Sequence, residues 1–362
     1  MPIVRFAARD PGAANVLASF IRSWQPAHID WDCWAMPQAA KVFERESIAH
    51  REVEDISFAF LSSEWQRDPA RILITGTSHY APFEPRLWSL AKQHDCPSLA
   101  ILDYWTNLAR RFYEGRPDAI GAIDSPQREE LLRLDFRSTD ILLTGHPWLA
   151  SVAAENHCDS KRRATKSDAT RVLFVSEPIA QDVAAGANEP YGFDEVDALE
   201  VLYRGALRIA HEGRKTDIAI KFHPYENPEN CRHRTAKWEK HGNLKLQHLA
   251  KNSHAREWVS WADLVVGISS VLLLEAMLLG KPVVSLQPGL KRENTFIAGN
   301  LGFAPTLTDA RRGAEFVASL IHDPQKREEL AAMHQPWVAS IPTYSVTPIT
   351  GWIENQLRIH HA

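Results

Sequence analysis

Short apolar runs alternate with helical stretches along nearly the whole chain, and this alternation limits the fold more than any other feature. In the first half, runs such as IVRFAA, RILITG and DILLTG are separated by segments with helical periodicity. Strands that alternate with helices form parallel, doubly wound sheets. The runs show little alternation of apolar and polar residues, as expected for strands that helices cover on both faces. The sequence therefore predicts an α/β fold.

The alternation restarts after a polar, basic segment at 155–170, where RVLFVSEP reads as a new first strand. A chain of 362 residues is long enough for two domains of ordinary size. We predict two Rossmann-like doubly wound domains facing a central cleft, at 1–154 and 171–340, joined by the linker 155–170. A last helix within 341–362 is expected to return to the first domain.

The segment 194–212 has the clearest helical pattern of the second half, with apolar residues on one face. Asp194 is placed to cap its first turn, and Gly213 to end it. This helix is predicted to be structural.

Composition excludes several classes of protein. The net charge of −4 disfavours general nucleic-acid binding, and the four cysteines form no CxxC pair that would indicate zinc or disulfides. The longest apolar runs are too short to cross a membrane, and the first residues do not resemble a secretory leader. We expect a cytoplasmic protein with reduced thiols.

In the first half, the candidate site residues follow predicted strands, where ligands of parallel sheets bind. Gly12 would let a nucleotide phosphate approach the next helix. Asp10, Asp103 and His146 are candidates for a general base that takes a proton from an attacking hydroxyl. The alternatives are structural: a tight turn for Gly12, a helix cap for Asp10 and a bonded turn residue for Asp103.

In the second half, Lys221-Phe222-His223-Pro224 closes an apolar strand. Pro224 would fix the turn, and the His223 imidazole would donate a hydrogen bond to a leaving phosphate oxygen. Lys221 would add positive charge. A purely structural His-Pro turn is the alternative.

The segment 261–289 carries the most specific pattern, because a strand, Gly267, two serines and an apolar helix follow one another. Ser269 and Ser270 would hold a phosphate at the positive end of the helix. Glu275 is a carboxylate among leucines that needs partners, and ribose hydroxyls would suit it. The alternatives are ordinary N-capping by the serines and a bond from Glu275 to a neighbouring loop.

This segment resembles the nucleotide-binding domain of GT-B glycosyltransferases and of the related non-hydrolysing UDP-GlcNAc 2-epimerases. The resemblance implies that the serines hold donor phosphates and that Glu275 holds the ribose. The pairing of His223-Pro224 with Ser269-Ser270 is also similar to motifs of bacterial sialyltransferases, CDP-glycerol glycerophosphotransferases and Kdo transferases. This pairing makes a cytidine nucleotide an option, and the resemblances together imply a UDP-, CDP- or CMP-type donor.

The leading interpretation is a metal-independent glycosyltransferase of polysaccharide or glycoconjugate assembly, with no cofactor and no metal site. Its acceptor would be a glycan or a lipid-linked glycan, and a lipid-linked acceptor implies peripheral contact with a membrane. The alternatives are a nucleotide-sugar 2-epimerase, a CDP-alcohol phosphotransferase of the same fold and a non-catalytic nucleotide-sugar binding protein.

Overall fold

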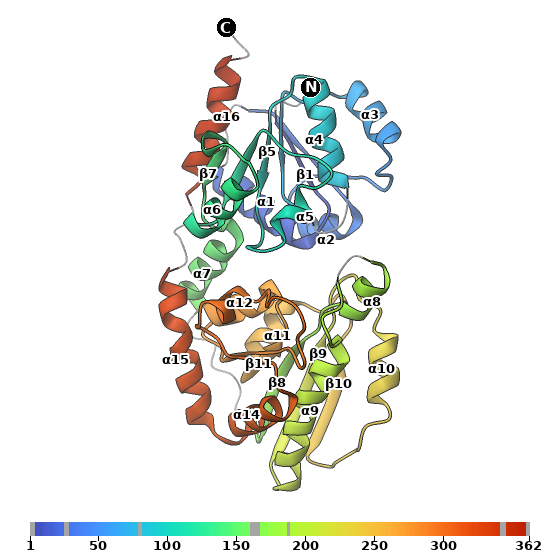
Figure 1. Ribbon diagram of the computed structural model, residues 1–362, viewed down its shortest axis with the longest axis vertical. Coiled ribbons are helices and arrows are strands. Elements are labelled where there is room, and N and C mark those ends of the chain that lie inside the picture. Colours follow the sequence, from blue (N-terminus) through green and yellow to red (C-terminus); the bar gives the residue numbers. More distant parts are fainter. Residues whose placement is uncertain are drawn as a thin grey trace. The chain divides into compact units, whose positions relative to one another are not determined.

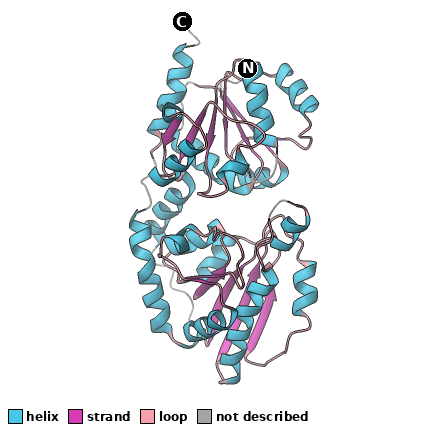
Figure 2. Cartoon of the chain, viewed as in Figure 1, coloured by secondary structure: helices cyan, strands magenta, loops and turns pink. Residues whose placement is uncertain are grey.

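The computed structural model describes residues 4–24, 29–78, 82–159, 167–186, 189–340 and 345–359. The chain divides into two compact units, of which unit 1 comprises Met1–Ser151 with Ile341–Ala362, and unit 2 comprises Val152–Ser340. Each unit contains one parallel sheet with helices around it (Figure 1 and Figure 2).

Unit 1 contains a seven-stranded sheet in the order β3-β2-β1-β4-β5-β6-β7, and all its strand pairs are parallel. The order reverses between β1 and β4, and ligands of doubly wound sheets bind at such a switch point. The strands are β1 (Val4–Ala8), β2 (Trp31–Ala35), β3 (Arg51–Glu52), β4 (Ile72–Thr75), β5 (Ser98–Ile101), β6 (Ala119–Ala122) and β7 (Ile141–Leu143).

Helices surround this sheet, and the last helix of the chain is one of them. Ile349 and Ile353 of α16 are fully buried, and the Ser345 backbone N–H donates to Thr144 O (3.2 Å). The helices are α1 (Pro11–Trp24), α2 (Pro37–Arg45), α3 (Phe58–Arg67), α4 (Phe83–Gln93), α5 (Leu108–Arg111), α6 (Ser125–Arg133), the 3-10 helix η1 (Ser138–Asp140), α7 (Pro147–Asp159), which continues into unit 2, and α16 (Thr347–Ile359).

Unit 2 repeats the same topology with six parallel strands in the order β10-β9-β8-β11-β12-β13, so its switch point lies between β8 and β11. The strands are β8 (Ala169–Val175), β9 (Lys215–Lys221), β10 (Leu244–His248), β11 (Leu264–Gly267), β12 (Val283–Leu286) and β13 (Thr306–Leu307). The helices are α8 (Ile179–Ala184), α9 (Glu195–His211), α10 (Glu229–Thr235), α11 (Ala255–Trp261), α12 (Val271–Leu278), α13 (Ile297–Asn300), α14 (Ala310–His322) and α15 (Pro324–Ser340).

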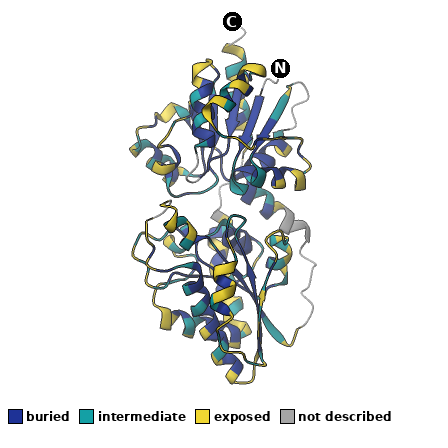
Figure 3. Ribbon diagram, turned by 90° about the vertical axis from the view of Figure 1, so that its right-hand side faces the viewer, coloured by how far each residue is buried: buried dark blue, intermediate teal, exposed yellow. Residues whose placement is uncertain are grey.

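The central strands are buried along their whole length, which is why they read as continuous apolar runs. β1, β4 and β5 of unit 1 and β11 and β12 of unit 2 contain only buried residues. Figure 3 shows the central strands in the colour of buried residues and many exposed residues on the helices. Burial of these apolar residues supplies the main driving force for each core.

The predicted α/β fold class of two doubly wound, Rossmann-like units is confirmed. The predicted cap of α9 is confirmed too, because Asp194 accepts from the backbone N–H of Asp197 (2.9 Å) and Gly213 has the positive φ of a helix end. The two-residue strands β3 and β13 were not predicted. Residues 160–166 of the predicted linker lie outside the described residues. The start of the predicted linker belongs to α7, and its last two residues belong to β8.

Candidate functional site

The candidate residues of unit 1 surround the switch point between β1 and β4. Asp103 follows β5, and its Oδ1 accepts from Thr77 Oγ1 (2.9 Å) and pairs with Arg111 Nη1 (2.6 Å). The side chains of Arg111 and Asp103 are only 6% and 14% exposed. Such a buried pair is strongly held, since removing either partner would leave an uncompensated charge.

Gly12 lies against the same carboxylate. A Cβ at position 12 would overlap Asp103 Oδ2, so a glycine is required for Asp103 to approach the first turn of α1. A ligand phosphate was predicted at Gly12, and in the structure the carboxylate of Asp103 lies there. Gly76, after β4, is restricted in the same way, because its Cβ would overlap Ala13.

His146 is buried and held at both ring nitrogens. Its Nε2 lies 3.0 Å from Asp103 O, and the Leu149 backbone N–H donates to Nδ1 (3.3 Å). The neutral tautomer with a proton on Nε2 satisfies both bonds. Burial lowers the pKa of His146 to about 4, so the neutral form is present at pH 7. The ring therefore positions the β5 exit loop, and its only lone pair is already engaged.

Asp10 directly precedes α1. Its carbonyl accepts from Ala14 N (2.9 Å), its Oδ1 pairs with Arg9 Nη1 (2.7 Å), and its side chain is 16% exposed. Of the three groups predicted as a base, Asp10 and Asp103 are carboxylates of similar exposure, 16% and 14%. The arginine paired with Asp10 is the more exposed of the two arginines, 26% against 6%. The roles predicted for Asp10, Asp103 and His146 in catalysis stay predictions.

In unit 2 the predicted His-Pro turn lies at the exit of β9. The Tyr225 backbone N–H donates to His223 Nδ1 (3.3 Å), and Glu226 N donates to His223 O (3.0 Å), which closes a turn with Pro224 at its second position. Burial, followed by the charges of Lys221 and Lys251, lowers the pKa of His223 to about 4. The half-buried ring is thus neutral, with Nε2–H as its donor.

This Nε2–H has no hydrogen-bond partner among the described residues, so it can donate to a ligand oxygen. Lys221 was predicted to add positive charge near a phosphate, and in the structure its side chain binds backbone carbonyls. Its ammonium group donates to Phe222 O (3.2 Å) and Lys251 O (2.8 Å), and burial lowers its pKa. The lysine therefore holds the neighbouring loop.

The two serines after β11 bind a carboxylate of the chain itself. Glu177 Oε1 accepts from the backbone N–H groups of Ser269 (2.6 Å) and Ser270 (2.7 Å), and Oε2 accepts from Ser269 Oγ (2.8 Å). Ser270 Oγ caps α12 by accepting from Leu272 N (3.3 Å). The donors that were predicted for a ligand phosphate thus form an anion site, and Glu177 occupies it.

Gly267 and Glu275 flank this turn. A Cβ on Gly267 would lie 3.0 Å from Val175 O, so its small size allows close packing against β8. Glu275 on α12 is 5% exposed, and it is not without an interaction partner. Both positions fit a structural role as well as the predicted ligand contacts.

The β8 exit joins the His-Pro turn to the Ser-Ser turn. Ser176 Oγ donates to Glu226 Oε1 (2.8 Å), and Glu226 Oε2 accepts from His223 N (3.0 Å), while the next residue, Glu177, binds the serines. The two motifs predicted from the sequence are therefore brought to one edge of one sheet. Glu177, Glu226 and Ser176 were not predicted.

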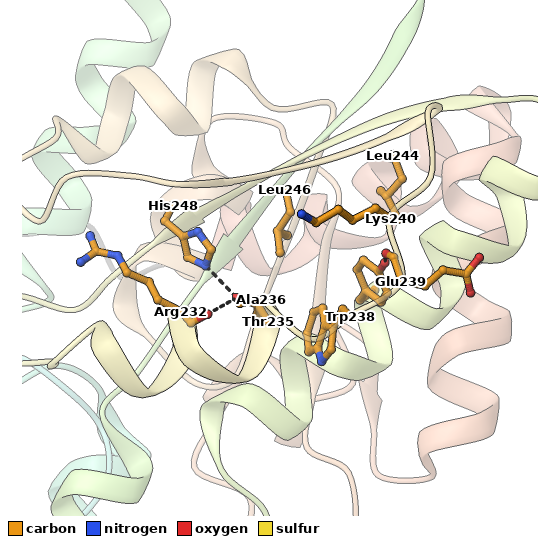
Figure 4. A pocket seen from close by; sticks show the side chains of 10 residues that line it. Arg232, Thr235, Ala236, Trp238, Glu239, Lys240, Leu244, Leu246 and His248 are labelled. Carbon is orange, nitrogen blue, oxygen red and sulfur yellow. Dashed lines mark hydrogen bonds between the residues drawn. The ribbon is translucent and has the colours of Figure 1, made fainter.

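A cavity of about 510 Å³ lies elsewhere in unit 2 (Figure 4). It lies between α10 and the edge strand β10, and its wall includes Arg232, Trp238, Lys240 and His248. None of the predicted site residues lines it. Within the described ranges, no group of His, Cys, Asp and Glu is arranged to hold a metal ion, and no helix is long and apolar enough to cross a membrane.

Comparison with solved structures shows the fold of the chain. MnaA of S. aureus, in a co-structure with UDP, matches with TM-score 0.72 and 13% identity over 99% of this chain and 97% of that chain. The UDP-GlcNAc 2-epimerase from Neisseria meningitidis, bound to UDP-GlcNAc, matches with TM-score 0.69 and 14% identity over 98% and 99%. The glycotransferase of kitacinnamycin matches with TM-score 0.59 and 12% identity over 98% and 100%.

These likenesses extend over whole chains, and they show that this protein has a GT-B-type fold. No protein-family model matches the sequence, and no curated protein sequence matches it.

Proposed function

We propose that this chain is an enzyme acting on a nucleotide-activated sugar, and that unit 2 binds the nucleotide. The observation that carries the proposal is the pairing of the His223 and Ser269-Ser270 turns at the switch point of unit 2. The Nε2–H of His223 has no hydrogen-bond partner in the part of the chain that the structure describes. Ligands bind at the switch point in doubly wound sheets. Solved structures of the same fold were determined with UDP or UDP-GlcNAc.

Within this class we favour a glycosyltransferase of glycoconjugate or polysaccharide assembly. A hydroxyl of the acceptor would give its proton to Asp10 as its oxygen bonds to the sugar carbon, and the bond from that carbon to the phosphate oxygen would break. His223 Nε2–H and the Ser270 hydroxyl would stabilise the charge on the leaving phosphate without a metal. The acceptor would be bound by unit 1.

Epimerisation of a nucleotide sugar is the second candidate. The UDP-GlcNAc 2-epimerase from Neisseria meningitidis matches this chain with a higher TM-score than the glycotransferase does, 0.69 against 0.59. An epimerase needs acid and base groups around one bound donor and no acceptor. Incubation with UDP-GlcNAc alone, followed by NMR of the sugar, separates the two reactions, because only the epimerase changes the donor without an acceptor.

The first test is a thermal-shift screen with UDP, CDP, CMP and GDP, each with and without EDTA. A nucleotide at a hundredfold its Kd should stabilise unit 2 by about 2.7 kcal/mol. We expect one nucleotide to raise the Tm, with EDTA making no difference, and His223→Ala to abolish this rise. His254→Ala is the matched control, because His254 is an exposed residue of unit 2 whose side chain makes no capping bond. If no nucleotide changes the Tm of the wild type, the proposed function is wrong.

A further inference from the structure

Glu84 is a completely buried carboxyl group at the switch point of unit 1. It lies in the first turn of α4 and has 0% of its surface exposed. Oε1 accepts from Ser78 Oγ (2.6 Å), on the β4 exit, and from Arg9 N (3.0 Å), on the β1 exit. Oε2 is also buried and has no hydrogen-bond partner in the described part of the chain. A buried oxygen without a partner calls for a physical explanation.

No cation balances this carboxyl group among the described residues. The guanidinium of Arg9 pairs with Asp10 (2.7 Å), and Arg86, on α4 itself, donates to Ile56 O (2.6 Å). The charge that acts on Glu84 is instead the carboxylate of Asp10. Two ionised carboxyl groups in one buried place are strongly disfavoured.

Burial first, and Asp10 second, raise the pKa of Glu84 to about 8, although the bonds from Ser78 and from backbone N–H groups act in the opposite direction. The first turn of α4 also favours a negative charge, but a helix dipole is weaker than the burial of an unpaired charge. Burial therefore determines the protonation state of Glu84, and its carboxyl group is neutral at pH 7.

We propose that Glu84 is a protonated carboxylic acid that positions the Arg9-Asp10 turn and leaves the negative charge of this carboxyl pair to Asp10. Glu84 acts through Asp10 and does not touch a ligand, because both its oxygens are buried. The inference rests on the proposed function only in the use of Asp10 as base. The protonation of Glu84 and its hold on Arg9 N do not depend on any ligand.

Glu84→Gln tests the proposal because glutamine has the shape of a neutral acid and keeps an acceptor for Arg9 N. Glu84→Ala removes that acceptor. Glu64→Gln is the matched control, since Glu64 is also buried in unit 1 but pairs with Arg51 and Arg67. Each variant is compared with the wild type by infrared spectroscopy and by its Tm as a function of pH.

The infrared difference between wild type and Glu84→Gln should contain the carbonyl band of a protonated carboxyl group at pH 7, and this band should vanish above about pH 8. The difference for Glu64→Gln should lack it at both pH values. If the first difference also lacks the band at pH 7, Glu84 is ionised and the inference is overturned, whatever the nucleotide screen shows.

The pH dependence of stability has a definite sign. The pKa of Glu84 is higher in the folded chain than its ordinary value of 4.5, so its stabilising contribution is complete below pH 4.5 and is lost as the pH rises through about 8. The wild type should therefore lose Tm relative to Glu84→Gln over this window. A Tm difference that is constant with pH would contradict the inference.

Activity completes the test once a donor and an acceptor are known. We expect the activity of the wild type to decline near pH 8, where Glu84 ionises. Glu84→Gln should keep kcat within about threefold and should not show this decline. Glu84→Ala should lose between about tenfold and a hundredfold in kcat through misplacement of Asp10. Equal losses in both variants, with an unchanged pH profile, would show that Glu84 is a packing residue only.

Discussion

Both units place a glutamate at the switch point of the sheet, where it binds the two loops that leave the central strands, but the two glutamates are satisfied in different ways. Glu84 joins the β1 and β4 exits of unit 1 and keeps one buried oxygen without a partner among the described residues. Glu177 belongs to the β8 exit of unit 2 and uses both oxygens on the serines that precede α12. Burial is the first cause of a raised pKa in both.

The difference shows how the same element of topology can be used. In unit 1 the carboxyl group is neutral and holds two loops together. In unit 2 three donors point at the carboxyl group from the beginning of a helix, where an anion is favoured. Unit 2 thus has an anion-binding site whose occupant is a side chain, and a ligand phosphate would compete with it.

The largest effect is expected for Arg111→Met, which tests whether the Asp103 carboxylate of unit 1 needs its cation. Loss of the partner leaves the Asp103 charge buried, and we expect a loss of about 3–5 kcal/mol in the free energy of unfolding. Urea titration monitored by circular dichroism measures it. Arg137→Met is the control, since the Arg137 side chain is 79% exposed and its pair with Asp140 should contribute little to stability. Equal effects of the two changes would show that Asp103 is not dependent on its ion pair.

Glu177→Ala comes next and tests the occupied anion site. Three donors lose their acceptor, so the variant should lose about 1–3 kcal/mol of stability. It should also bind inorganic pyrophosphate at least about tenfold more tightly than the wild type, because the competing negative charge is gone. Isothermal calorimetry measures the affinity, with Glu200→Ala, which removes an exposed carboxylate of α9, as control. Unchanged or weaker binding would mean that the serines do not form a phosphate site.

Ser270→Ala should have the smallest effect. It removes the side chain that caps α12 and should lower the free energy of unfolding by about 1 kcal/mol, as measured by urea titration. Glu177 keeps its bond from the Ser270 backbone N–H in this variant. A loss as large as that of Glu177→Ala would show that the hydroxyl does more than cap the helix.

The fold could be predicted from the sequence because its signals are local. Each central strand is a run of apolar residues, and turn residues separate helices from the strands that follow, as at Gly213 between α9 and β9. The strands β3 and β13 could not be predicted, because a strand of two residues has no recognisable sequence pattern. The alternation of strands and helices also predicts where each strand ends. Because the ends of parallel strands lie at one edge of the sheet, His223 and the two serines could be predicted to lie at the same edge.

The partners of these residues could not be predicted in the same way. Glu177 is 92 positions from Ser269 along the chain, and Glu84 is 75 positions from Arg9. Nothing in the sequence around Glu177 distinguishes it from a turn residue. A usable signal existed for Glu84, which is a charge near the start of the apolar helix PFEPRLWSL, and an acid in such a place requires a partner or a proton.

The return of the last helix to unit 1 has a consequence for synthesis on the ribosome. Unit 1 is built from the first 151 residues and from α16, whose Ile349 and Ile353 are fully buried there. Chains emerge from the N-terminus onward, so every residue of unit 2 is made before the helix that completes unit 1. The unit that is begun first is therefore completed last, and until then the surface of unit 1 that receives these isoleucines stays open to chaperones and to aggregation.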